Sequence, residues 1–123
     1  KFLINFNDSF CNGSPDNPSA EYIGNNIIKI AQVISAKAPK TKVYVQTVLP
    51  IDKEIYKNNI LKVNEIIEAN EKENAYEIID LYSIFATENG LIKKELSSDG
   101  IHLNEKGYNT WVEFIKPIVY SLN

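Results

Sequence analysis

The stretch at residues 42–50 has the sequence KVYVQTVLP, and it decides the fold class. Valine, tyrosine and threonine dominate it, and such β-branched and aromatic side chains favour a strand. The stretch stops at Pro50, which has no backbone N–H to donate to a neighbouring strand. We therefore expect a strand from Lys42 to Leu49.

Two further strands are expected on either side of this one. Residues 2–6, FLINF, form a short and nearly continuous apolar run that ends at Asn7 and Asp8. Such a run is typical of a strand buried on both faces, as in a parallel sheet. Residues 76–82, YEIIDLY, have the same character and predict a third strand.

Helices are expected between and after these strands, because apolar residues recur there every three or four positions. The first helix is expected to begin with Asn17 as its N-cap and Pro18 at its first position. The last is expected to be capped by Asn104 and to run to about Ser121, with a kink or break at Pro117. The three apolar stripes are Ile23, Ile27, Ile30 and Ile34; Tyr56, Ile60, Val63 and Ile67; and Tyr108, Trp111, Ile115 and Ile118.

The alternation of strands and helices predicts an α/β domain with a parallel sheet and helices on both faces. Ligands bind such sheets beyond the carboxyl ends of the strands. That edge would bring together Asn7, Asp8, the loop after Pro50 and the segment before Asn104. We expect a functional site on this rim.

The composition excludes several classes of protein. With 44% hydrophobic and 24% charged residues the chain is expected to form one globular domain, and a net charge of -3 disfavours a dedicated nucleic-acid binder. No apolar run approaches the ~20 residues that span a bilayer, so no transmembrane segment is expected. The lone Cys11 excludes an internal disulfide and a thiolate metal cluster.

The single histidine, His102, lies three residues after Asp99, with a flexible Gly100 between them. A tight turn could bring the carboxylate to the imidazole Nδ1. Such a pair acts as a general base, because the carboxylate fixes the tautomer and stabilises the imidazolium. The plainer alternative is that Asp99 is a turn residue and His102 a surface side chain.

The block at residues 99–108, DGIHLNEKGY, resembles the final sequence block of the SGNH hydrolases, also called GDSL esterases and lipases. The resemblance implies that Asp99 and His102 are catalytic. It also implies that the Asn7 amide donates to the oxyanion hole, with Asp8 beside it at the substrate. The implied fold is a three-layer α/β/α, flavodoxin-like sheet of five strands, of which this chain would hold three strands and three main helices.

The rest of the chain resembles the family in the same order, with two departures. The stretch at residues 43–50 resembles the strand that often ends in Leu-Pro, and Asn64 lies where these proteins commonly have Asn. Asn5 stands where the third block has Gly. The first block, with the nucleophilic Ser, and the second, with an oxyanion-hole Gly, have no counterpart. Residues 1–123 are therefore expected to be a partial SGNH-hydrolase-like domain whose first βα units lie upstream of Lys1.

Asn7-Asp8-Ser9-Phe10 has a superficial likeness to the first block, which would make Ser9 the nucleophile. The order of elements fits a start at the third block better, so Ser9 is expected to be a hydroxyl in a turn.

The resemblance implies serine-dependent ester hydrolysis through an acyl-enzyme, with no cofactor. A metal site at Asp8, Asp99 and His102 is disfavoured, because one imidazole and no thiolate give too few nitrogen or sulfur ligands for zinc. The alternatives are a non-catalytic carbohydrate- or lipid-binding module on the same fold, and a structural or interaction domain. The expected partners are a small-molecule ester, the upstream segment of the domain and, through the exposed edge of residues 2–6, a second copy of the chain. Localisation stays open, because any targeting signal would lie upstream.

Overall fold

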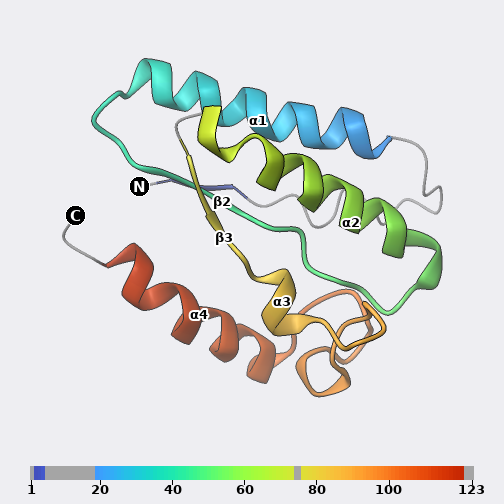
Figure 1. The fold of residues 1–123 in the computed structure, drawn as a ribbon. Helices are drawn as coiled ribbons and strands as arrows, with labels where there is room; N and C mark the ends of the chain where they lie inside the picture. Colours follow the sequence, from blue (N-terminus) through green and yellow to red (C-terminus); the bar gives the residue numbers. More distant parts are fainter. Residues whose placement is uncertain (1, 5–18, 74–75, 121–123) are drawn as a thin grey trace.

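The computed structural model of the chain describes residues 2–4, 19–73 and 76–120 (Figure 1). Strands and helices alternate along it, as the sequence predicts. The elements are β1 (Phe2–Ile4), α1 (Ala20–Lys37), β2 (Val43–Gln46), α2 (Glu54–Ala69), β3 (Glu77–Ile79), α3 (Tyr82–Phe85) and α4 (Glu105–Val119), with short 3-10 turns η2 (Glu71–Glu73) and η3 (Lys94–Leu96).

The three strands form one parallel sheet in the order β1-β2-β3. Phe2 is paired with Val43, and Tyr44 with Glu77, so β2 lies in the middle. Helices α1 and α2 cover one face of the sheet and α4 covers the other (Figure 1). The predicted α/β class with helices on both faces is therefore confirmed, and the layers are α/β/α.

The central strand β2 is buried on both faces. Val43 and Val45 pack into the core beneath α1 and α2, whereas Tyr44 packs into the core on the α4 side. Gln46 links β2 to α4, because its Oε1 accepts a hydrogen bond from Nε1 of Trp111 at 2.6 Å. A strand buried in this way needs apolar residues at successive positions, as at Val43, Tyr44 and Val45, and its polar Gln46 is buried with a hydrogen-bond partner.

Strands β2 and β3 are shorter than predicted, ending at Gln46 and Ile79. Beyond them the backbone leaves the regular ladder. The N–H of Leu81 turns back to the carbonyl of Ile79 at 3.0 Å, and Tyr82 already begins α3, its N–H bonded to Thr47 Oγ1 at 2.9 Å. The predicted strand positions are thus confirmed, but their carboxyl ends are wrong by three residues each.

The predicted stripe of α2 is confirmed, because Tyr56, Ile60, Val63 and Ile67 are all buried. Asn64 lies within this buried face. Its Oδ1 accepts the N–H of Val48 at 2.7 Å and its Nδ2 donates to the carbonyl of Val48 at 3.0 Å. One side chain therefore satisfies both backbone groups of a residue that has left the sheet.

Helix α1 differs from the prediction at its start and on its face. Its N-cap is Ser19, whose Oγ accepts the N–H of Tyr22 at 3.1 Å, so the predicted cap at Asn17 is wrong. The helix turns Gly24 toward α2, where a Cβ would lie 2.9 Å from Ile66 Cγ2. Of the predicted stripe, Ile23 and Ile27 are buried and Ile34 is partly buried, whereas Ile30 is 37% exposed.

Helix α4 confirms the predicted cap, because Asn104 Oδ1 accepts the N–H of Gly107 at 2.8 Å. The helix continues through Pro117 to Val119, so a break there is wrong; the N–H of Tyr120 bonds to the carbonyl of Lys116 and closes the last turn. The predicted burial of Tyr108 is also wrong, since this side chain is 53% exposed. The neighbouring Gly107 takes the buried position in the first turn.

Candidate active site

The predicted rim is present where the loop after β2 meets the turn before α4. The N–H of Asp52 donates to the carbonyl of Gly100 at 2.7 Å. This bond joins the loop after Pro50 to the segment before Asn104, as the topology predicts. Asn7 and Asp8, which were expected on the same rim, lie outside the described residues, and so does Ser9.

The contact expected from the Asp99 and His102 spacing is observed. Asp99 Oδ2 lies 2.8 Å from Nδ1 of His102. The other carboxylate oxygen, Oδ1, accepts the backbone N–H of Ile101 at 2.8 Å and that of His102 at 2.7 Å. The two oxygens thus have separate tasks: one holds the backbone of the turn and the other holds the ring.

These bonds favour the ionised carboxylate. The hydrogen bond from the His102 ring, followed by those from the N–H groups of His102 and Ile101, holds the pKa of Asp99 well below its usual range. An ionised carboxylate can only accept a hydrogen bond, so the neutral ring takes the Nδ1–H tautomer, which donates to Asp99, and Nε2 becomes its basic nitrogen. The side chains of His102 and Asp99 are 63% and 54% exposed, which leaves the ring accessible from solvent.

Gly100 makes the tight turn between the two residues possible. Its φ of +81° lies in the left-handed region, which favours glycine. A Cβ at this position would also lie 2.7 Å from Cβ of Asp52. The turn therefore needs glycine both for its backbone angle and for its contact with the loop after β2.

A hollow of about 350 Å³ lies beside this turn. It is lined by residues of the turn and of the segments packed against it: Asp52, Ile92, Lys94, Ser97, Ser98, Asp99 and Gly100. Its mixed polar and charged lining distinguishes it from an apolar lipid pocket. Asp52 and Ser97 were not predictable from the sequence as site residues, because neither belongs to a motif and their positions depend on how the turn folds back.

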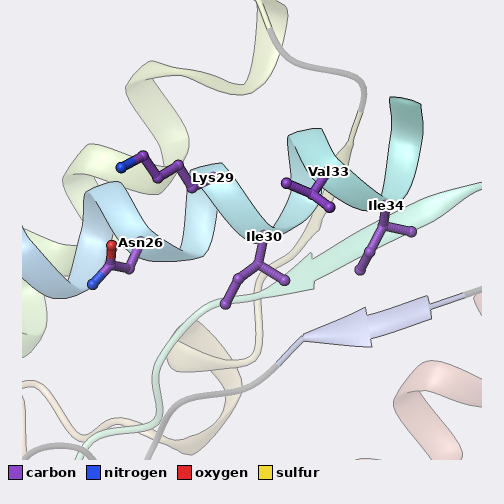
Figure 2. Close-up of a pocket in the computed structure, with 5 residues that line it drawn as sticks. All are labelled: Asn26, Lys29, Ile30, Val33 and Ile34. Carbon is purple, nitrogen blue, oxygen red and sulfur yellow. The ribbon is translucent and has the colours of Figure 1, made fainter. Parts of the chain in front are cut away.

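A second hollow, of about 580 Å³, is apolar and lies along α1. Figure 2 shows Ile30 and Ile34 pointing from the helix toward the side of β2 and β1, with Val33, Asn26 and Lys29 around them. Three of these five side chains are aliphatic, and none of the five carries a carboxylate, imidazole, hydroxyl or thiol. The chemistry of the molecule is therefore expected at the turn before α4 and not at this hollow.

Within residues 2–4, 19–73 and 76–120, no group of three or more His, Cys, Asp or Glu side chains is arranged to hold a metal ion.

No helix in the described part of the chain is both long and apolar enough to cross a membrane.

Comparison with known proteins gives a consistent result. Residues 2–110 match the family model described as GDSL-like Lipase/Acylhydrolase family. A GDSL-like lipase from Bacteroides thetaiotaomicron is similar in structure, with a TM-score of 0.69 and 27% identity over 82% of this chain and 52% of that one.

Two further solved structures share the fold at lower identity. A candidate platelet activating factor from Streptococcus pneumonia has a TM-score of 0.76 and 21% identity over 86% of this chain and 54% of its own. A candidate acylhydrolase from Bacteroides fragilis has a TM-score of 0.74 and 22% identity over 95% of this chain and 60% of its own. The chain thus spans between about half and three fifths of the structures that it matches. Among curated proteins, none matches its sequence.

Proposed function

Because the chain belongs to the GDSL-like lipase/acylhydrolase family, a family of ester hydrolases, we propose that it supplies the proton-transfer half of a serine esterase. The observation that carries the proposal is the 2.8 Å contact between His102 Nδ1 and Asp99 Oδ2. This contact sets the tautomer that a general base requires. A module that only binds a sugar or lipid has no evident need for such a pair.

In the proposed reaction a serine hydroxyl attacks the carbonyl carbon of an ester while Nε2 of His102 takes the hydroxyl proton. The bond between the carbonyl carbon and the alkoxy oxygen of the ester then breaks. The imidazolium gives the proton to this leaving oxygen, and an alcohol is released. Water attacks the resulting acyl-enzyme by the same route and releases the acid. Asp99 stays ionised throughout, orienting the ring and stabilising its positive charge.

The nucleophilic serine is proposed to lie upstream of Lys1. Two observations support a domain that continues beyond these residues. Within the described part of the chain, β1 pairs with β2 alone, so β1 is an edge strand. Ile30 and Ile34, which line the apolar hollow, point from α1 toward β2 and β1 (Figure 2). The chain also spans only 52–60% of the structures that it matches. Upstream βα units packed there would cover both the strand edge and the hollow.

The isolated 123-residue chain is proposed to be inactive, because it would lack its nucleophile. With β1 as an edge, it would associate with a second copy of itself. Light scattering of the isolated chain and of the full-length protein tests this proposal. We expect association of the isolated chain only.

The amide of Asn7 is proposed to donate to the oxyanion, with Asp8 beside the bound substrate. Loss of one such donor costs roughly 10²–10³ in rate. The substrate is proposed to be an acyl or acetyl ester of a small molecule, sugar or lipid.

Hydrolysis of an aryl acetate by the full-length protein tests the proposal. The substitution His102→Ala should lower kcat by roughly 10³-fold, the contribution typical of a general base. Lys106→Ala, an exposed change in the first turn of α4, is the matched control and should leave kcat unchanged. An inactive wild-type protein that still binds acylated sugars or lipids would replace the esterase with the binding module.

A further inference from the structure

Ser97 is a buried polar side chain in a turn that is otherwise open to solvent. It is 8% exposed, whereas Ser98 and Asp99, which follow it, are exposed. Burial of a hydroxyl is unfavourable unless its hydrogen bonds are made inside the protein. Its position two residues before Asp99 makes the identity of those partners informative.

The hydroxyl of Ser97 bridges the two ends of the turn. Its Oγ accepts the N–H of Gly100 at 2.9 Å and lies 2.6 Å from the carbonyl oxygen of His102. A third contact, with Asp99 Oδ1, is longer at 3.3 Å. A serine hydroxyl has one proton, and the shorter distance assigns it to the His102 carbonyl.

These bonds constrain the one residue that gives the turn its freedom. Gly100 lies between Asp99 and His102 and has the least restricted backbone. Ser97 holds its N–H, and Asp52 holds its carbonyl from the loop after β2. Because Asp99 Oδ1 in turn accepts the N–H groups of Ile101 and His102, the direction of the carboxylate depends on the path of this backbone.

We propose that Ser97 is a positioning residue for His102. The Ser97 hydroxyl closes the turn, so that the imidazole of His102 faces the carboxylate of Asp99. The role of the pair in catalysis rests on the proposed function; the positioning of the ring does not. Ser97 touches neither the ring nor the reacting atoms. It acts through the backbone of Gly100 and His102.

The base of the turn is held without Ser97. The N–H of Asn104 donates to the carbonyl of Leu96 at 3.0 Å, and Nδ2 of Asn104 donates to the carbonyl of Glu95 at 3.0 Å. These bonds fix the entry to α4 independently of the hydroxyl. The fold should therefore survive the loss of the Ser97 hydroxyl, while the orientation of His102 should not.

The test compares Ser97→Ala with Ser97→Thr, which restores the hydroxyl, and with Ser98→Ala as the matched control. Nitrogen-15 NMR of the full-length protein reports the tautomer of His102, with the signal assigned by its loss in His102→Ala. We expect Ser97→Ala to melt within a few degrees of the wild type and to lose part of the Nδ1–H tautomer. We expect kcat for an aryl acetate to fall about tenfold, the worth of one hydrogen bond, with KM nearly unchanged.

Ser97→Thr should recover most of both signals, and Ser98→Ala should leave the tautomer unchanged. An unchanged tautomer in folded Ser97→Ala would overturn the proposal. So would an equal effect of Ser98→Ala on the tautomer, or the global unfolding of Ser97→Ala, which would make the residue structural. If the wild-type protein hydrolyses no ester, the proposed function fails, and the tautomer measurement still decides the role of Ser97.

Discussion

Two regions of the molecule use one polar side chain to hold the backbone, and they do so in opposite surroundings. In the core between α2 and the sheet, the buried amide of Asn64 bonds to both the N–H and the carbonyl of Val48. On the rim, the exposed carboxylate of Asp99 bonds to the N–H groups of Ile101 and His102. The number of backbone bonds is the same, but the surroundings are not.

The difference shows where structure and chemistry separate in this fold. Oδ1 and Nδ2 of Asn64 each form a hydrogen bond with the backbone of Val48, and in the core water cannot replace these bonds. In Asp99, Oδ1 bonds to the backbone of the turn and Oδ2 bonds to the His102 ring, and both side chains are exposed to solvent. We therefore expect changes at Asn64 to reduce stability and changes at Asp99 to reduce activity.

The largest expected effect is that of Asp99→Asn on catalysis. An amide can present its Nδ2 to the ring, which favours the wrong tautomer, so kcat of the full-length protein should fall by roughly 10³-fold or more. The midpoint of thermal unfolding should change little, because water can satisfy the turn. Glu95→Gln, an exposed change in the same segment, serves as the control. A large loss of stability with activity retained would reverse the comparison.

The next effect is that of Asn64→Leu on stability. Two backbone groups of Val48 would be left without partners in the core, at about 1–3 kcal/mol each, so the free energy of unfolding should fall by roughly 2–6 kcal/mol. Urea denaturation measures it. Asn58→Leu, on the exposed side of α2, should change this free energy by less than about 0.5 kcal/mol. If the two variants were equally stable, the buried amide would not have the structural role assigned to it.

The sequence predicted the buried region and the rim unequally. The stripe of α2 was predicted fully, because this helix packs along its whole length. The exposure of Tyr108 was not predicted, since it depends on the close packing at Gly107, and neither was that of Ile30, which lines the hollow along α1. Periodicity identifies an apolar face but does not show which part of it is covered.

On the rim, the spacing of Asp99 and His102 allowed their contact but also fitted a turn residue beside a surface side chain, and it was the resemblance of residues 99–108 that favoured the pair. The contribution of Ser97 was not predictable, because it depends on a turn that folds back onto its own backbone. Asn64 was noticed only through a resemblance, since no pattern marks a buried amide that bonds to a distant loop. Asn7 and Asp8 lie outside the described residues, so their proposed roles stay predictions.

The smallest expected effect is the pH dependence that Asp99 contributes to stability. Its pKa is lowered in the folded chain, first by the His102 ring and then by backbone N–H groups. The folded state therefore favours the ionised carboxylate, so this contribution is present above the ordinary pKa of 3.8 and is lost as the pH falls further. Urea midpoints at pH 5 and pH 2.5 should differ less in Asp99→Asn than in the wild type. Equal differences would mean that the folded turn does not stabilise the ionised form.

Covalent labelling of the full-length protein with a fluorophosphonate, followed by mass spectrometry, tests the central claim most directly. The probe reacts with a serine only when a base takes its proton. We predict one labelled serine, upstream of Lys1, and a labelling rate that falls by at least roughly 10²-fold in His102→Ala. Labelling at Ser9, or a rate that His102→Ala leaves unchanged, would contradict the assignment of His102 and Asp99 as the base that serves an upstream nucleophile.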